Sequence, residues 1–239
     1  MKLGVMQPYF FPYLGYFDLI SNVDLFIVYD TVQFIKQGWI NRNRILHPNR
    51  LNWQYISVPV EKSSFHSSYR TSIQDVSISS TKAWQQHIIG QLAHYEKFAP
   101  FAREVINLVD DSLAIQESSI SRLNIHVLER CVNHVGLNFQ YQYFSKIQMQ
   151  MDVSLSAEER ILDICEYFGA TEYVNLPGGV DLYHPEAFER RNIKLTFRNL
   201  PTFVYPTGPY AFEPNLSIID LLMWNKPEDI RKHLEEFRS

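Results

Sequence analysis

The sequence predicts an α/β fold, a mixed or mostly parallel sheet flanked by helices, with a helical insertion in the middle. Short apolar runs of strand length recur along the 239 residues, and several are followed by a polar or glycine-containing turn and a helical pattern. Between about residues 81 and 136, helical patterns follow one another without an intervening strand. We therefore expect one α/β domain over residues 1–239, in which the segment 81–136 could form a subdomain.

The overall composition is that of an ordinary globular protein, with 46% hydrophobic and 20% charged residues. The formal net charge of −4 argues against general binding to nucleic acid or to a membrane surface. The two cysteines, Cys131 and Cys165, lie in helical patterns, so we expect core thiols rather than a disulfide framework, and a reducing, cytoplasmic location. No apolar run reaches the length of about 18 residues that a membrane span needs.

The chain begins with a strand, turn, helix and second strand. Leu3–Met6 is apolar and predicts a buried strand, Gln7–Tyr13 is a turn rich in proline and aromatic residues, and Leu14–Ser21 has a helical pattern. A second apolar run, Leu25–Tyr29, predicts the next strand, and Asp30 follows it. Ligands of such sheets bind beyond the carboxyl ends of the strands, so we expect the turn and the segment after Asp30 to lie at that edge.

The segment from residue 31 to residue 60 is basic although the whole chain is acidic. It contains no Asp or Glu, and its cations are Lys36, Arg42, Arg44 and Arg50. Arginine binds phosphate or carboxylate through two parallel hydrogen bonds, and lysine acts as a point charge. Trp39, Asn41 and Asn43 accompany these cations, and a strand at Tyr55–Val60 follows. We interpret the segment as an anion-binding loop; the alternative is a solvated basic loop.

A serine-rich stretch, residues 61–80, lacks a clear period, and we expect a loop followed by a short strand at Ser72–Ile78. Loops of this length in a compact domain often serve as lids or binding loops, and a mobile solvent-exposed loop is the alternative. Its candidate chemical groups are His66 and Arg70.

Two long helices are predicted next. Thr81 can cap a helix over about Lys82–Lys97, and Asp111 or Ser112 can cap a second one over about Leu113–Val135, which Gly136 ends. Histidines lie in pairs on these helices, at positions 87, 94, 126 and 134. Because no Asp, Glu or Cys is placed beside them as a further ligand, we expect no metal site.

The last hundred residues return to alternating strands and helices. Ser156 and Glu159 form a capping box that opens a helix. The remaining elements are predicted from apolar patterns, prolines and caps: strands at Leu137–Phe144, Glu172–Asn175 and Ile193–Phe197, and helices at Ala157–Phe168, Pro185–Arg191, Ser217–Trp224 and Pro227 to about Phe237.

A Gly-Gly loop follows the strand at Glu172–Asn175. Gly178 and Gly179 allow backbone conformations that other residues avoid, and they let a ligand approach the main chain. A tight turn would explain the two glycines, but it would not explain Asp181 and Tyr183 beside them. We therefore include Asn175 and this loop in the candidate binding site.

Several motifs spread over the chain carry a family resemblance. They are Gln7 to Phe17, Asp30, Gln33, Phe34, Lys36, Trp39, Asn41 to Ile45, Ser57 to Val60, Pro177 to Gly179, Leu182, Tyr183, and Phe212 to Asp220. Together they resemble the WbqC-like family of bacterial surface-polysaccharide (O-antigen) biosynthesis clusters. Many members carry His immediately before the Gln-Pro pair, and this chain has Met6 there. The role of that histidine as a base is therefore not carried over.

The resemblance implies work on a nucleotide-linked sugar, most concretely N-acyl or aminoacyl transfer to an amino sugar without a further cofactor. The donor would be an acyl or aminoacyl group on a carrier protein or another thioester. In this hypothesis Asp30 is the general base and His66 is the reserve. The diphosphate is held by Lys36, Arg42 and Arg44. The base or the sugar stacks on Tyr9, Phe11, Trp39 and Tyr183. Hydrogen bonds to the substrate are made by Gln7, Asn41, Asn43 and Asp181.

Two alternatives remain open. The order strand, loop, helix, strand is also that of nucleotidylyltransferases of the HxGH type, which use Mg²⁺. The segment Pro12 to Tyr16 stands where their signature would be, but tyrosines replace both histidines, and tyrosine does not stabilise a transferring phosphoryl group as a cation would. The other alternative is a non-catalytic subunit that binds a nucleotide sugar within a biosynthetic complex.

Overall fold

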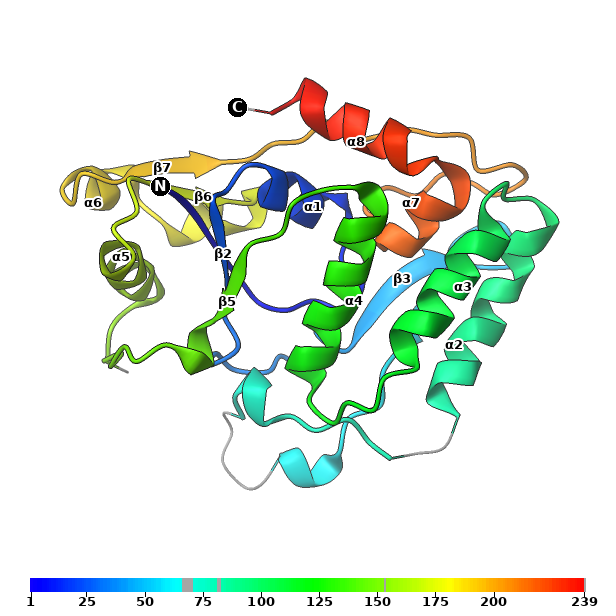
Figure 1. Ribbon diagram of the computed structural model, residues 1–239, viewed down its shortest axis with the longest axis horizontal. Coiled ribbons are helices and arrows are strands. Elements are labelled where there is room, and N and C mark those ends of the chain that lie inside the picture. The colour runs from blue at the N-terminus through cyan, green and yellow to red at the C-terminus, as the bar shows by residue number, and fades with distance from the viewer. Residues whose placement is uncertain (66–70, 81–82, 153, 239) are drawn as a thin grey trace.

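The central feature of the computed structural model is a sheet of five parallel strands flanked by helices, the predicted fold class (Figure 1). Residues 1–65, 71–80, 83–152 and 154–238 are described. The strands are β1 (Lys2–Met6), β2 (Leu25–Val28), β5 (Tyr141–Tyr143), β6 (Glu172–Asn175) and β7 (Lys194–Phe197). Their order is β5-β2-β1-β6-β7, and each neighbouring pair is parallel.

The strand order reverses beside β1. The chain runs outward from β1 to β2 and β5, then returns to the other side of β1 for β6 and β7. Leu3 of β1 pairs with Leu25 of β2 on one side and with Tyr173 of β6 on the other. In an open parallel sheet, the crevice at such a reversal lies beyond the carboxyl ends of the two strands and is the usual ligand site. The fold thus places the turn after β1 opposite the Gly-Gly loop after β6.

Both faces of the sheet are buried, which explains why the strands are apolar runs rather than alternating patterns. On β2, Phe26 and Val28 belong to the larger core, whereas Ile27 belongs to the smaller one. The smaller core is covered by α5 (Ala157–Tyr167) and α6 (Pro185–Glu189). Figure 1 shows these two helices on the opposite side of the sheet from α4.

The larger core holds residues of six α-helices together with the other face of the sheet. These helices are α1 (Leu14–Ser21), α2 (Trp84–Leu92), α3 (Ala102–Leu113), α4 (Ile120–Val135), α7 (Ile218–Trp224) and α8 (Pro227–Glu236). Side chains of the segment 81–136 and of the sheet therefore share one core. The single-domain organisation stays a prediction, and this shared core is consistent with it. No helix in the described ranges is long and apolar enough to cross a membrane.

The basic segment after β2 forms a hairpin: its first strand stands where we expected a loop, and its second overlaps the predicted strand Tyr55–Val60. Strands β3 (Arg42–Leu46) and β4 (Trp53–Ser57) pair antiparallel, with Arg44 opposite Tyr55. The two arginines of β3 made this stretch look like a loop in the sequence. In the strand, Asn43 and Ile45 are buried, and Arg42 and Arg44 are half-buried. The alternation of polar and buried side chains suits a hairpin with one exposed face.

Two further boundaries differ from the prediction. Residues 72–78 contain a 3₁₀ turn with isolated bridges in place of a strand. The helix predicted over about Leu113–Val135 starts later, because Ser119 caps α4 and residues 114–118 form a connection. Its predicted caps, Asp111 and Ser112, belong to α3, a helix that was not predicted. The predicted capping box of Ser156 and Glu159 is present.

The 3₁₀ helices among the described residues are η1 (Lys62–Ser64), η2 (Ile73–Asp75), η3 (Ala93–Lys97), η4 (Phe144–Lys146) and η5 (Pro177–Leu182). The predicted cap Thr81 lies outside the described residues.

Candidate functional site

A cavity of about 330 Å³ lies at the sheet reversal, and we call it the switch-point pocket. One wall is the start of α1, from Tyr13 to Gly15, and another is the Gly-Gly loop, from Leu176 to Gly178. The third wall consists of residues 198–203 after β7 with residues from the segment 205–221. The end of the turn after β1 and the Gly-Gly loop therefore face the same pocket, a question that the sequence left open.

Tyr13 and Gly15 fit closely at the start of α1. A Cβ atom built on Gly15 would lie 2.5 Å from the Tyr13 ring, so only glycine lets this ring pack across the first turn of the helix. Burial, followed by the nearby Tyr9 and Asp18, raises the pKa of Tyr13 to about 12. The Tyr13 hydroxyl is therefore protonated at neutral pH and can act as a hydrogen-bond donor beside the pocket.

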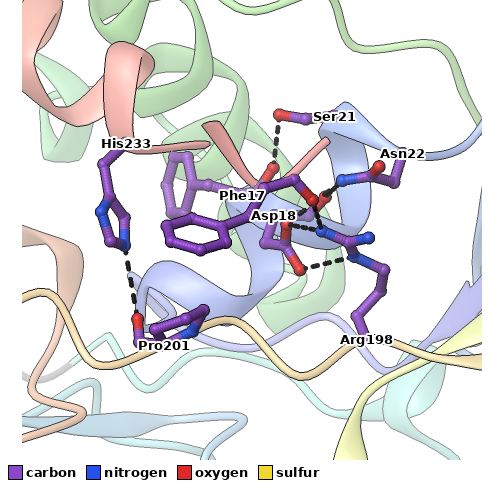
Figure 2. A network of polar contacts seen from close by, with 8 residues as sticks. Phe17, Asp18, Ser21, Asn22, Arg198, Pro201 and His233 are labelled. Carbon is purple, nitrogen blue, oxygen red and sulfur yellow. Dashed lines mark hydrogen bonds and ion pairs between the residues drawn. The ribbon is translucent and has the colours of Figure 1, made fainter. Parts of the chain in front are cut away.

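A buried ion pair lines the pocket on its inner side (Figure 2). Arg198 donates from Nε and from one terminal nitrogen to the two carboxylate oxygens of Asp18, at 2.9 and 2.8 Å. Asn22 also donates to Asp18, at 3.1 Å. This pair fixes the end of β7 to α1, so two walls of the pocket are held together by a charge-assisted, bidentate contact.

The irregular third wall is held by α8 and by the hairpin. His233 of α8 stacks on Phe203. Its Nε2 lies 3.3 Å from the carbonyl oxygen of Pro201, a contact that Figure 2 shows. Farther along, Glu213 lines the pocket and its carboxylate lies 3.6 Å from Arg44 of β3. Contacts from distant parts of the chain therefore order a wall that has little regular structure.

A second polar network lies behind this wall. Tyr205 lines the pocket, and its hydroxyl donates to Asp220 at 2.7 Å. Tyr95 donates to the other carboxylate oxygen of Asp220 at 2.5 Å. Complete burial raises the pKa of Asp220 to about 6, although these hydrogen bonds act in the opposite direction. Burial therefore disfavours the ionised form of Asp220, and the hydrogen bonds from the two tyrosines reduce this penalty.

The three residues of the N-terminal turn that were predicted to bind ligand, Gln7, Tyr9 and Phe11, do not line the pocket. Phe11 is fully buried in the larger core, so the expectation that it stacks on a ligand is wrong for this conformation. Tyr9 is half-buried and packs against Tyr16, with ring centroids 5.1 Å apart. Gln7 is partly exposed, and its carbonyl oxygen accepts a hydrogen bond from Tyr16. Of this turn, Tyr13 rather than the three predicted residues lines the pocket.

The predicted cation cluster is not assembled around the pocket. Lys36 lies over the Phe65 ring, and Arg42 lies over the Tyr55 ring and donates to carbonyl oxygens of residues 37 and 38. Arg44 lies near the rings of Trp39 and Trp53, at 5.4 and 5.0 Å. None of the three cations lines the switch-point pocket, but Arg44 contacts Glu213 and Asn215, which do.

The two asparagines predicted to bind ligand support the backbone instead. Asn43 is buried and donates to the carbonyl oxygens of Phe10 and Phe11, at 3.0 and 2.9 Å. Asn41 donates to the carbonyl oxygen of Val58 at 3.0 Å. The bonds of Asn43 join the hairpin to the turn after β1, and the bond of Asn41 joins the two ends of the hairpin to each other.

The Gly-Gly loop contributes to the pocket with its first half only. Gly178 lines the pocket, and a Cβ atom there would meet open space. A Cβ on Gly179 would lie 2.4 Å from the Asn175 side chain, so this glycine serves a close contact. Tyr183 packs on aromatic residues of the smaller core, and Asp181 is exposed; neither lines the pocket. Of the residues predicted from this loop, Gly178 lines the pocket, and its binding role stays a prediction.

The two candidate bases lie elsewhere. Asp30, at the carboxyl end of β2, lines a second cavity and accepts two hydrogen bonds from Ser145. His66 lies outside the described residues, as does Arg70.

In the described ranges, no group of three or more His, Cys, Asp or Glu side chains is arranged to hold a metal ion. Cys131 and Cys165 are buried, and burial raises the pKa of each thiol to about 12.

Sequence reasoning missed Asp18, Arg198 and Glu213 as pocket residues. An acid inside the apolar helical pattern Leu14–Ser21 was the available signal for Asp18, because a buried acid needs a partner. Its partner is 180 residues away, and no local pattern identifies it. Glu213 belongs to a motif that carried the family resemblance, and that motif could have identified it.

Comparison with known proteins agrees with the resemblance seen in the motifs. A family model described as the WbqC-like protein family matches residues 7–232. The uncharacterized protein Rv1507c of Mycobacterium tuberculosis (strain ATCC 25618 / H37Rv) is 32% identical over 225 residues, which cover 92% of each chain. No solved structure matches this chain. The chain belongs to the WbqC-like protein family.

Proposed function

We propose that this protein is a transferase that acts on a nucleotide-linked amino sugar and transfers an acyl or aminoacyl group to the sugar nitrogen. The observation that carries the proposal is the switch-point pocket, which lies at the carboxyl edge of the parallel sheet between β1 and β6. Mononucleotide and dinucleotide ligands bind at this place in many open α/β sheets. The WbqC-like family model starts at residue 7 and covers the turn after β1 as well as β6 and its Gly-Gly loop, which supports treating this edge as the functional one.

The lining of the pocket suits a sugar. It combines aromatic rings, among them Tyr13 and Phe212, with polar side chains such as Asn199, Thr202 and Glu213. A sugar ring offers apolar faces that pack on aromatic rings, and its hydroxyl groups need a few placed donors and acceptors. A volume of about 330 Å³ is at the lower end of the range for small-molecule sites, about 300–1,000 Å³, and admits the sugar portion of the substrate.

Of the two carboxylates that line the pocket, Asp18 is fully buried and paired with Arg198, so Glu213 is the one proposed to take up a proton. Its carboxylate lines the cavity and is held 3.6 Å from Arg44. In the proposed step, the neutral amine of the sugar attacks the carbonyl carbon of a thioester donor. A C–N bond forms, the C–S bond breaks, the thiolate leaves, and the amine proton passes to Glu213. Glu213 replaces Asp30 as the proposed base because Asp30 faces a different cavity.

A thermal-shift panel tests the binding part of the proposal. UDP-glucosamine, UDP-glucose, UDP and UTP are each added to the full chain, with and without Mg²⁺. We expect the amino sugar to raise Tm most, since a ligand that binds only the folded state stabilises it. If UTP with Mg²⁺ gave the largest shift, nucleotidylyl transfer would replace the proposal. If none of the four compounds stabilised the protein, the proposal would lose its basis.

The chemical part is tested with Glu213→Gln and with the control Glu189→Gln, which changes an exposed acid on α6. Transfer from an acyl thioester to UDP-glucosamine is followed by mass spectrometry. We expect the Glu213 variant to lose about 10²–10⁴-fold in kcat, the usual contribution of a positioned base, while the control keeps its rate. Equal rates for both variants would remove Glu213 from the proposed step. Ligand binding without any turnover would identify a binding subunit.

A further inference from the structure

A second cavity, of about 170 Å³, opens at the carboxyl ends of β2 and β5, and we call it the β2–β5 cavity. It is lined by Asp30 after β2, Ser145 and Lys146 after β5, and Ser121 and Arg122 in the first turn of α4. None of these residues lines the switch-point pocket, so nothing in the proposed function uses this cavity.

The inner part of the cavity carries a buried carboxylate. Asp30 is 2% exposed, and its oxygens accept from the backbone amide and the hydroxyl of Ser145, at 3.0 and 2.7 Å. A carboxylate offers about four acceptor positions, so positions are left for donors that enter the cavity. A buried carboxylate at this point favours a cationic donor and disfavours an anion.

A buried hydroxyl beside it lacks a partner. Ser121 is 2% exposed, and its Oγ atom has no hydrogen-bond partner among the described residues. Leaving a buried hydroxyl unpaired costs free energy, and such groups call for an explanation such as a ligand. Because Ser121 lines the cavity, a bound molecule would supply the missing hydrogen bond.

The outer part of the cavity is positively charged. Lys146 is exposed. The Arg122 side chain is 59% exposed and pairs with Glu117 through Nε at 3.0 Å, and this contact does not use its two terminal nitrogens. The first turn of α4, a helix of 16 residues, adds the positive end of its dipole. Negative charge is therefore favoured at the outer part, and positive charge at the inner part.

We propose that the β2–β5 cavity binds a small α-amino acid, whose ammonium group meets Asp30 and Ser121 while its carboxylate meets Arg122, Lys146 and the start of α4. Both signs of charge lie within one small cavity, and a zwitterion satisfies both. A phosphate would satisfy only the outer cations and would approach Asp30 unfavourably. A simple amine would leave those cations without a counter-charge. The volume, below that of drug-sized sites, restricts the side chain to a small one.

The test compares amino acids with analogues that lack one charge. Glycine, L-alanine and L-serine are titrated into the full chain by calorimetry and thermal shift, beside N-acetyl-L-alanine, which lacks the ammonium group, and L-alaninamide, which lacks the carboxylate. We expect at least one amino acid to bind and raise Tm, and both analogues to bind at least about tenfold more weakly than L-alanine. Equal binding of N-acetyl-L-alanine would identify a simple anion site and overturn the proposal, as would no binding by any of the three amino acids.

Two variants locate the binding. Ser121→Ala removes a hydroxyl that has no partner in the free protein, so Tm without ligand should be unchanged or higher, whereas affinity should fall several-fold, about 3–10-fold for one hydrogen bond. Asp30→Asn should weaken binding by about tenfold or more, and the matched control Asp75→Asn, an exposed acid outside the cavity, should not. Unchanged affinity in Ser121→Ala would contradict the proposal even if Asp30→Asn failed to fold.

Discussion

Replacing Arg198 by alanine removes the cation from a buried pair that joins two walls of the switch-point pocket. Asp18 is fully buried, and only 9% of the Arg198 side chain is exposed. Of the hydrogen-bond donors to Asp18 that Figure 2 draws, only Asn22 would remain in the variant. An uncompensated buried charge of this kind costs about 3–5 kcal/mol of unfolding free energy.

This magnitude can be compared with an exposed ion pair in the same sheet. Lys194 of β7 pairs with Glu172 of β6 at 3.3 Å, and the Lys194 side chain is 70% exposed. Exposed pairs contribute about 0–1 kcal/mol, because solvent screens them and two long side chains lose freedom. For a chain of this size, 3–5 kcal/mol corresponds to a loss of about 6–20 °C in Tm. The control Lys194→Ala should lose about 4 °C or less.

The assay is urea unfolding and thermal unfolding of wild type, Arg198→Ala and Lys194→Ala. A double variant, Asp18→Leu with Arg198→Met, removes both charges and should be more stable than Arg198→Ala alone, since no unpaired charge remains. The reasoning would be refuted if Arg198→Ala lost no more stability than Lys194→Ala. It would also be refuted if the double variant were less stable than the single one.

Three further predictions follow from other contacts. Because burial raises the pKa of Asp220 from 3.8 to about 6, the folded state holds a proton that the unfolded chain has lost, and stability should fall by about 3 kcal/mol as pH rises from about 4 to 6. Urea titrations at several pH values should show that Asp220→Asn flattens this slope. Gly15→Ala should displace the Tyr13 ring, change near-UV circular dichroism and weaken UDP-glucosamine binding, while Gly90→Ala should not. Ser156→Ala should lower the unfolding free energy by about 1 kcal/mol in urea, because the helix α5 loses its cap.

The sequence was most informative where one local signal fixes one element. The helix α1 has the predicted bounds Leu14–Ser21, and β6 has the predicted bounds Glu172–Asn175, because short apolar runs between turns have few alternatives. The strand β3 was missed because the charges of Arg42 and Arg44 were taken as a sign of a loop, whereas the second strand of the hairpin was expected near Tyr55–Val60. The antiparallel pairing that places them on one face depends on a strand farther along the chain.

The site was only partly predictable for the same reason. The meeting of the first turn with the Gly-Gly loop follows from the pairing of β1 with β6, which the sequence does not reveal because the two strands are more than 160 residues apart. Phe11 shows the limit of the approach, since an aromatic residue in a polar turn can be a core residue. The pair Asp18 and Arg198 depends on tertiary contact alone, and no spacing in the sequence encodes it.

The central claim, that the switch-point pocket is the substrate site, is tested most directly by filling the pocket. A Cβ on Gly178 meets open space in the pocket wall, so Gly178→Phe should fold normally and occupy the cavity; Gly90→Phe is the matched control on the exposed face of α2. Calorimetric titration with UDP-glucosamine should show binding to wild type and to the control, and none to Gly178→Phe. Wild-type affinity in a folded Gly178→Phe protein would contradict the claim.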